Sequence, residues 1–304
     1  MNGNSLLELD DFDSATLTRV LERAEHWKAD PVSVDRVLSG AGVALLFEKP
    51  SARTRASTEM AVVSLGGHPI TMRAEEVGVG VRESAADVAR TLSCFCDCIG
   101  ARVFDHAVLV EMASAVATPI VNLLSDDAHP LQAIADLLTI QECLGSLEGR
   151  RVAYIGDGGN VTASLAFAAA LSGLELTVAS PSGYELDPEV VARARNLGGQ
   201  IDLTADPHEA VKGADVVYTD VWTSMGQEAE AEIRRAAFAG FTVNGALMGA
   251  AGEQAIFLHC LPAHRGEEVA DEVLDGPTSR VWQQAENRFH AARSAMYELV
   301  ARAR

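Results

Sequence analysis

Short apolar runs alternate with amphipathic segments along most of the chain. The first such run, over 43–47, predicts a buried strand, and it stops before Pro50, which disfavours helix in the residue preceding it. Ser51 stands where a helix N-cap is favoured, so a helix is predicted over 52–65. This unit of a buried strand followed by a helix recurs, and such alternation is typical of parallel α/β sheets.

The recurring units form two series on either side of a break at 145–149. In the first series we predict helices over 17–27, 84–95, 107–116 and 130–144, strands over 68–72, 98–103 and 119–123, and a loop over 73–82. In the second we predict strands over 152–155, 175–179, 201–204, 216–219 and 255–258, and helices over 161–172, 188–197, 207–212 and 283–303. The expected fold class is therefore α/β, with two doubly wound parallel-sheet domains, 1–146 and 147–285.

Polar clusters lie at the carboxyl ends of six of the predicted strands. They comprise 51–55, Arg102, 129–132, 156–160, 220–227 and 259–262. Ligands of open α/β sheets bind beyond the carboxyl ends of the strands, so we expect the clusters to share one cleft between the two domains.

The helix that Ser51 caps has the features of an anion site. Its first turn carries Arg53 and Arg55, whose guanidinium groups can each give a phosphate two parallel hydrogen bonds. The unpaired N–H groups and partial positive charge of a helix N-terminus also favour an anion. An ordinary capped helix with surface arginines is the alternative interpretation.

Charge and composition narrow the class of partner. The chain has 304 residues, 48% hydrophobic and 22% charged, and a formal net charge of −19. Such an acidic protein is a poor match for nucleic acid or an anionic membrane, and no apolar run reaches the roughly 18 residues that span a bilayer. The acidic N-terminal segment lacks the features of a signal peptide, so we expect a cytoplasmic protein.

Two further motifs invite a metal or cofactor interpretation. Cys94, Cys96 and Cys98 lack the CxxC spacing of zinc sites, and we favour buried thiols between a helix and the next strand. The loop at 156–160 resembles a dinucleotide-binding turn, but Val161 occupies the place of the third glycine. We therefore expect no metal and no cofactor.

Taken in order, seven segments resemble those of the transcarbamylases, in particular the ornithine carbamoyltransferases. They are SARTR at 51–55, Arg102, HPLQ at 129–132, GDGGN at 156–160, DVWTSMGQE at 220–228, HCLPAHRGEE at 259–268 and AENRFH at 285–290. The resemblance implies a carbamoyl phosphate-binding first domain, against which a C-terminal helix of about 286–304 packs, and an ornithine-binding second domain. It also implies a homotrimer, with or without further assembly, that makes L-citrulline and phosphate in arginine metabolism without a cofactor.

The resemblance also implies which residues bind each substrate. Carbamoyl phosphate would contact Ser51, Ala52, Arg53, Thr54, Arg55, Gly78, Arg102, His129, Gln132, Cys260, Leu261 and Arg288. L-Ornithine would contact Asn160, Asp220, Ser224 and Met225, and its reacting amine would meet Cys260 and the carbonyl of Leu261. The catalytic residues implied are Arg102, His129, Asp220 and Cys260.

The chain departs from the family pattern at three positions. Ala52 replaces a threonine, and its side chain is expected to point away from the ligand; Gly159 replaces an asparagine. Gly78 stands where a glutamine of a neighbouring subunit is usual, within an acidic segment that begins at Glu75. We hypothesise that this loop contributes less to the site, so that Gly78→Gln would tighten carbamoyl phosphate binding.

Two alternatives remain open from the sequence. One is a transcarbamylase for another amine, such as putrescine or a modified ornithine. The other is a weakly active paralogue that binds the ligands, and the altered loop at Gly78 is its only support.

Overall fold

The structure is a computed structural model that describes residues 4–223, 226 and 228–304. The chain forms two compact units: Met1–Leu138 with Glu286–Arg304, and Thr139–Ala285. The division falls inside α6 (Pro130–Leu144) and α13 (Val281–Ala303), whereas the boundary expected from the sequence follows α6. Which substrate each unit binds stays a prediction.

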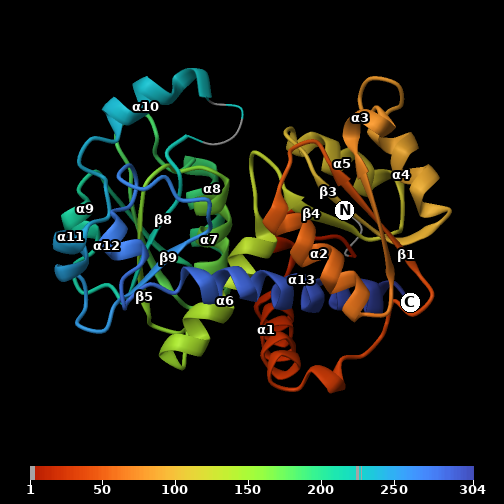
Figure 1. The fold of residues 1–304 in the computed structure, drawn as a ribbon, viewed down its shortest axis with the longest axis horizontal. Coiled ribbons are helices and arrows are strands. Elements are labelled where there is room, and N and C mark those ends of the chain that lie inside the picture. Colours follow the sequence, from red (N-terminus) through yellow and green to blue (C-terminus); the bar gives the residue numbers. More distant parts are fainter. Residues whose placement is uncertain (1–3, 224–225, 227) are drawn as a thin grey trace. The chain divides into compact units, whose positions relative to one another are not determined.

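The first unit is built on a four-stranded parallel sheet in the order β2-β1-β3-β4, of which Figure 1 labels β1, β3 and β4. Its strands are β1 (Gly42–Phe47), β2 (His68–Arg73), β3 (Cys96–Arg102) and β4 (Ile120–Leu124). Its helices are α1 (Ser14–Ala29), α2 (Ala52–Ser64), α3 (Ala74–Val77), α4 (Ala85–Ser93) and α5 (His106–Ala115), with short 3-10 turns at Leu9–Asp11 and Pro31–Ser33. The apolar run that predicted β1 is buried from Val43 to Phe47, as a central strand requires.

The structure differs from prediction around the loop over 73–82 and the cysteines after it. The loop contains the helical turn α3, and α4 ends at Ser93, two residues earlier than expected. Because β3 begins at Cys96, alternate residues of the strand face inward, and Cys96 and Cys98 are buried. The expectation of buried thiols is confirmed for these two and wrong for Cys94, which is exposed at the end of α4.

The second unit is built on a five-stranded parallel sheet in the order β7-β6-β5-β8-β9. Its strands are β5 (Arg151–Ile155), β6 (Glu175–Ala179), β7 (Gln200–Thr204), β8 (Val216–Thr219) and β9 (Ile256–His259). Its helices are α7 (Asn160–Ser172), α8 (Pro188–Asn196), α9 (Pro207–Ala210), α10 (Ala231–Ala237), α11 (Gly245–Gly249) and α12 (Asp271–Leu274), with a 3-10 turn at Glu228–Glu230. The sequence predicted the strands and α7 to α9, but not α10 to α12.

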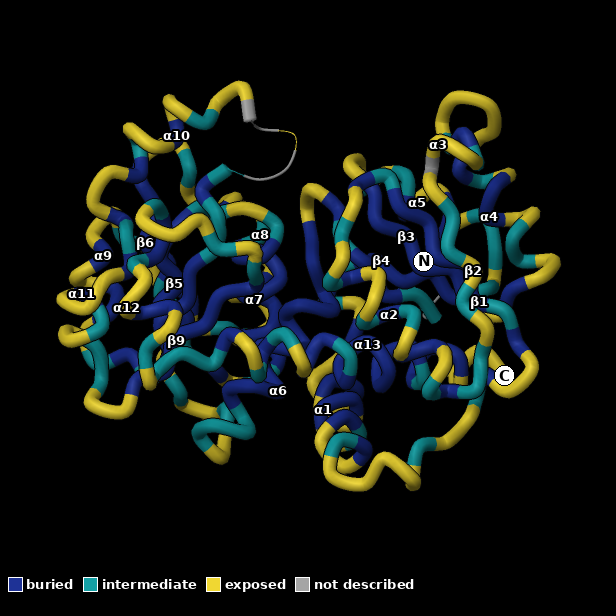
Figure 2. Tube along the Cα trace, viewed as in Figure 1, coloured by how far each residue is buried: buried dark blue, intermediate teal, exposed yellow. Residues whose placement is uncertain are grey.

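Burial explains why each sheet is stable. The strands other than the edge strands β2 and β7, together with the helices α6, α7 and α13, are mostly buried (Figure 2). In the second unit the core includes the stacked rings of Trp222 and Phe238, whose centroids lie 5.5 Å apart. No helix within the described ranges is long and apolar enough to cross a membrane.

The strand orders place a topological switch point in each sheet. In the first, β1 is followed by β2 on one side and β3 on the other, and Phe47 pairs with Arg102 at the carboxyl ends. In the second, the switch point lies between β5 and β8, whose ends lead to the segments that begin at Gly156 and Asp220. Loops diverge at such points and leave a crevice, so ligand-binding residues are expected there.

Candidate active site

The N-terminus of α2 begins the site in the first unit. Ser51 has an extended backbone, and its side chain accepts a hydrogen bond from the N–H of Thr54, which confirms the predicted N-cap. Thr54 is buried, Arg53 is half-buried and Ala52 is exposed. Arg55 is exposed, and its Nε donates to Glu59 Oε1 at 2.8 Å, so a role for Arg55 in phosphate binding stays a prediction.

Four distant segments bring buried polar side chains together around Arg288 of α13. Its Nη2 donates to Thr54 Oγ1 at 2.8 Å, and its Nη1 donates to Gln132 Oε1 and lies 3.2 Å from His129 Nε2. Arg102, at the end of β3, donates from Nη1 to the same Thr54 oxygen at 3.3 Å. All five side chains are at most 8% exposed.

Arginine can only donate hydrogen bonds, so each of its partners must be an acceptor. A guanidinium group donates and never accepts, so His129 must accept at Nε2 and carry its proton on Nδ1. Burial, together with the charges of Arg288, Arg102 and Arg53, lowers the pKa of His129 well below its ordinary value. The ring is therefore neutral at pH 7. Thr54 Oγ1 accepts from two guanidinium groups, which leaves its O–H proton available to donate.

The result is a set of donors concentrated in a buried and strongly positive environment. The hydroxyl of Thr54, the Nδ1–H of His129 and the guanidinium groups of Arg53, Arg102 and Arg288 belong to this set. Preorganised donors of this kind bind a dianion and stabilise negative charge that develops on a carbonyl oxygen. Such an arrangement fits acyl transfer from a phosphorylated donor.

In the second unit, the segment after β9 is tied to Asp220, the residue that follows β8. Cys260 Sγ donates to Asp220 Oδ1 at 2.8 Å. Burial raises the pKa of Asp220 above its ordinary value, and the hydrogen bond from Cys260 partly opposes that shift. The structure thus brings together two of the residues that the sequence assigned to catalysis.

His259 orients the backbone beside Cys260. Its Nδ1 accepts the N–H of Leu261 at 2.8 Å, so its proton lies on Nε2 and is donated to Glu268 Oε1 at 3.1 Å. Leu261 has a φ of 58°, a left-handed conformation unusual for a leucine. His259, which is fully buried together with Glu268, therefore holds the Cys260–Leu261 peptide next to this unfavourable φ angle.

Asp220, His259 and Cys260 also bring possible metal-ligand atoms within 4.8 Å of one another. The thiol of Cys260 already donates to Asp220, and Nδ1 of His259 already accepts from Leu261. A metal ion would have to displace both hydrogen bonds, so the donor set does not fit a resident ion.

Of the other residues assigned to ornithine, Asn160 follows β5. Asn160 is half-buried and begins α7 after Gly159, in the first turn of the helix. Ser224 and Met225, which the resemblance assigns to ornithine, lie outside the described residues. The segments on either side of them are anchored by Arg234, which donates to Trp222 O and forms an ion pair with Glu230.

The geometry of Gly78 bears on the expected effect of a glutamine in its place. Its φ is 76°, a left-handed conformation, and a Cβ added there would lie 2.8 to 3.0 Å from side-chain carbons of Arg82. The left-handed backbone and the packing of Arg82 therefore favour glycine at this position. A glutamine would strain this loop conformation, which argues against tighter binding, but the effect of Gly78→Gln on carbamoyl phosphate affinity stays a prediction.

Sequence reasoning missed three residues that support the site: Asp136, Arg234 and Glu268. Asp136 lies one helical turn after Gln132, a spacing that places both on one face of α6 and could have been noticed. Arg234 lies on α10, a short helix with no clear sequence pattern, and Glu268 contacts His259 from nine residues away.

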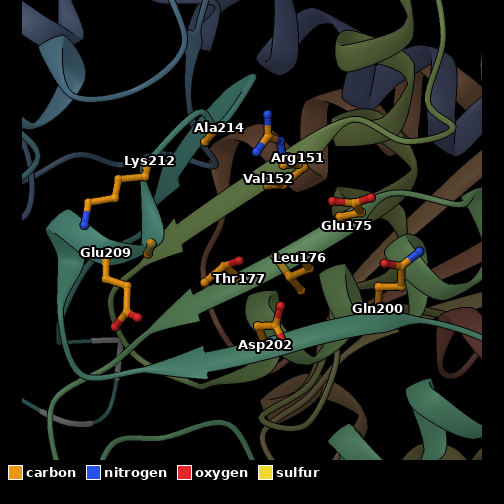
Figure 3. A pocket seen from close by; sticks show the side chains of 11 residues that line it. Arg151, Val152, Glu175, Leu176, Thr177, Gln200, Asp202, Glu209, Lys212 and Ala214 are labelled. Atoms are coloured by element: carbon orange, nitrogen blue, oxygen red, sulfur yellow. The ribbon is translucent and has the colours of Figure 1, made fainter.

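A polar cavity of about 280 Å³ lies elsewhere in the second unit (Figure 3). Its lining includes Arg151, Glu175, Thr177, Gln200, Asp202, Glu209 and Lys212. Arg151, Glu175 and Gln200 are the first residues of their strands, so the cavity lies toward the amino ends of the sheet. None of the candidate site residues, which follow the carboxyl ends, lines it.

Comparison with known proteins gives consistent matches along the chain. Residues 4–142 match the carbamoyl-P binding domain, and 148–299 the Asp/Orn binding domain, of the aspartate/ornithine carbamoyltransferases. The chain is similar to ornithine carbamoyltransferase of Acidothermus cellulolyticus, with 48% identity over 94% of this chain and 93% of the relative. It is also similar to the anabolic enzyme of Pyrococcus furiosus, with 46% identity over 97% of this chain and 95% of that one.

Solved structures that resemble the chain are also ornithine carbamoyltransferases. The ornithine carbamoyltransferase of Thermus thermophilus superposes with a TM-score of 0.90 at 45% identity, covering 98% of this chain and 99% of its own. The anabolic enzyme of Campylobacter jejuni superposes with a TM-score of 0.93 at 34% identity, covering 98% and 99%. These likenesses confirm the α/β fold class with two parallel-sheet domains.

Proposed function

The chain belongs to the aspartate/ornithine carbamoyltransferase family, and we propose that it transfers the carbamoyl group of carbamoyl phosphate to the δ-amine of L-ornithine. The products are L-citrulline and phosphate, as part of arginine metabolism. The observation that carries the proposal is the buried donor cluster of Thr54, Arg102, His129 and Arg288, whose polarity suits a carbamoyl group attached to a dianion.

In the proposed reaction, the first unit binds and activates carbamoyl phosphate. The N-terminus of α2, with Ser51 and Arg53, binds the phosphate, and the Thr54 hydroxyl and His129 Nδ1–H donate to the carbonyl oxygen. Negative charge grows on this oxygen when the amine attacks the carbonyl carbon. Each well-placed donor contributes about 3–4 kcal/mol of stabilisation at that stage.

Collapse of the tetrahedral intermediate breaks the bond between the carbonyl carbon and the phosphate oxygen. The phosphate leaves with the bonding electron pair, which the nearby guanidinium groups of Arg53 and Arg102 stabilise. The nitrogen of the former amine releases one proton, so that a neutral ureido group remains. No covalent bond to the protein forms, and positioning of the two substrates supplies much of the acceleration.

The second unit, we propose, selects the amine. Ornithine's δ-amine has a pKa of about 10.4 if it resembles that of lysine, so only a small fraction is neutral at pH 7. The groups proposed to meet this nitrogen are the thiol of Cys260 and the carbonyl of Leu261, which directly follows the Cys260–Leu261 peptide held by His259. Asp220 and Asn160 would recognise the α-amino and α-carboxylate groups, respectively, together with Ser224 and Met225.

A homotrimer is also proposed, on the basis of family membership and the surface of the first unit. β2 is an edge strand, and near it Met60, Val63, Ile70 and Phe95 are between 37% and 73% exposed. Exposed apolar side chains on an unpaired sheet edge favour association with another chain. Sedimentation analysis of the purified protein tests the stoichiometry.

We further propose a cytoplasmic location. No disulfide joins the five cysteines, all of which lie in described segments, and unpaired thiols are typical of a reducing compartment. Fractionation of the source cells, followed by detection with an antibody, tests this proposal.

The activity is tested with carbamoyl phosphate and a panel of amines that includes L-ornithine, putrescine and acylated ornithine. Release of phosphate and formation of the ureido product are followed together. Citrulline formed from ornithine, with little product from the other amines, supports the proposal. Turnover only with another amine contradicts the assignment of ornithine, and binding without any turnover contradicts catalysis itself.

A further inference from the structure

Asp136 is a buried carboxylic acid in the first unit to which the proposed reaction assigns no role. It lies on α6, one turn after Gln132, and is 0% exposed. Gln132 Nε2 donates to Asp136 Oδ1 at 2.7 Å, while Gln132 Oε1 accepts from Arg288 Nη1. The amide of Gln132 is therefore held between an acceptor on one side and a donor on the other.

These two contacts settle which way the Gln132 amide faces. The carboxylate of Asp136 cannot donate when ionised, and the guanidinium of Arg288 cannot accept. Rotating the amide by half a turn would set N–H groups against a guanidinium and one oxygen against another. The amide oxygen therefore faces the donor cluster of Thr54, His129 and Arg288, and the amide nitrogen faces away from it.

We propose that Asp136 is a positioning residue that determines donor specificity, by keeping the oxygen of Gln132 turned toward the bound carbamoyl group. A carbonyl oxygen has two lone pairs, and Arg288 uses one of them. The other can accept an N–H from the carbamoyl nitrogen. The oxygen of Gln132 can accept a hydrogen bond from an NH2 substituent but not from a methyl group of similar size. It therefore distinguishes the two substituents.

The inference rests on the proposed function and gives it a measurable consequence. Acetyl phosphate keeps the phosphate and carbonyl groups of carbamoyl phosphate and replaces NH2 with CH3. Bound in the same place, it would leave the second lone pair of the buried Gln132 oxygen facing a methyl group, and a buried lone pair without a hydrogen bond is unfavourable. We expect the wild-type protein to bind carbamoyl phosphate about tenfold or more tightly than acetyl phosphate.

The test compares the dissociation constants of the two ligands by calorimetry, without ornithine, in the wild type and two variants. Asp136→Leu removes the acceptor for the amide nitrogen, so the Gln132 amide can turn, and the affinity ratio should fall to about threefold or less. Asp136→Asn offers an amide oxygen in the same place and should keep the ratio near its wild-type value. If Asp136→Leu does not fold, Asp136→Ala takes its place.

The affinity ratio separates a positioning role from a merely structural one. A structural defect would weaken both ligands by the same factor and leave the ratio unchanged, and that result overturns the inference. So does an equal loss of the ratio in Asp136→Asn and Asp136→Leu, because it would show that charge matters rather than hydrogen bonding. A wild type that binds both ligands equally also overturns it.

Failure of the proposed function gives a different result. If wild-type protein binds no carbamoyl phosphate or makes no citrulline, the proposed function fails. If it does both and the ratio does not respond to Asp136→Leu, only the role of Asp136 fails.

Discussion

Replacing Arg234 with methionine should destabilise the second unit by about 3 kcal/mol, because the change removes the charge from a buried junction. Arg234 is 7% exposed, and its Nη1 donates to Asp157 Oδ2 and to Trp222 O, each at 2.9 Å. Its guanidinium also lies 4.9 Å from the ring centre of Tyr184. Methionine keeps much of the apolar stem but leaves the carboxylate and the carbonyl without this donor.

The size of this destabilisation follows from the Asp157 carboxylate that Arg234→Met leaves without its partner. Removing one partner of a buried ion pair typically costs about 3–5 kcal/mol, because an uncompensated charge remains. The Asp157 side chain is 21% exposed and can still reach water, so the lower end of that range applies. Arg235 provides a matched control, since its ion pair with Glu267 is about half exposed, and Arg235→Met should cost less than about 1 kcal/mol.

The penalty should also depend on pH. Burial already raises the pKa of Asp157, and Arg234 partly opposes that shift, so Arg234→Met should raise this pKa further. A carboxyl group with a raised pKa in the folded state contributes stability below its unfolded pKa and loses it as pH rises through the folded pKa. The penalty of Arg234→Met should therefore be largest near pH 7 and shrink as acid protonates Asp157.

Urea denaturation of the wild type and both variants, followed by circular dichroism at several pH values, measures these quantities. A double-mutant cycle with Asp157→Asn should give a coupling energy of at least about 1 kcal/mol for the pair. An Arg234→Met penalty no larger than that of Arg235→Met would refute the reasoning. A penalty that stays constant between neutral and acidic pH would refute the part assigned to Asp157.

Three other predictions follow from particular residues. Gly78→Gln should destabilise the protein by about 1–2 kcal/mol, because of the left-handed backbone and the contact with Arg82. Carbamoyl phosphate affinity should stay unchanged or become weaker. Thermal melts measure the stability and calorimetry the affinity, and tighter binding would contradict the prediction. The imidazole of His129 should remain neutral at pH 6, with its proton on Nδ1, because its pKa is lowered; nitrogen NMR would show an imidazolium there if the assignment is wrong. Burial raises the pKa of Cys98 to about 12, so iodoacetamide at pH 8 should label exposed Cys94 and spare Cys98 in the native protein, and mass spectrometry would detect the opposite pattern.

The pattern of apolar residues was sufficient to predict the parallel sheets, because buried strands and capped helices leave local signals. Ser51 is an example, since its hydrogen bond to Thr54 involves residues three apart. The short helices α10 to α12 leave weaker signals, and their positions depend on packing against the core around Phe238 and Val273. A fold class can therefore be predicted where its elements are long and periodic, while short connecting helices depend on tertiary contacts.

In the candidate site, too, short motifs predicted which residues take part, but not the features that depend on tertiary contacts. Motif resemblance identified Thr54, His129, Gln132 and Arg288, which the structure brings into one hydrogen-bonded cluster. It did not indicate the proton positions, which depend on contacts between residues more than 150 positions apart in the chain. Nor could it show that Gly78 adopts a left-handed backbone conformation, in which the usual glutamine would be strained.

The position of Arg288 in the last helix has a consequence for folding during synthesis. The first unit comprises Met1–Leu138 and Glu286–Arg304, so most of it leaves the ribosome before the second unit has been synthesised. Domains can begin to fold during synthesis, at about 5–20 residues per second, but this unit must wait for its last helix. Until then Thr54, His129 and Gln132 lack the guanidinium that orients them. The unit that starts folding first is thus the last to become competent, and a nascent or truncated chain cannot hold carbamoyl phosphate in this way.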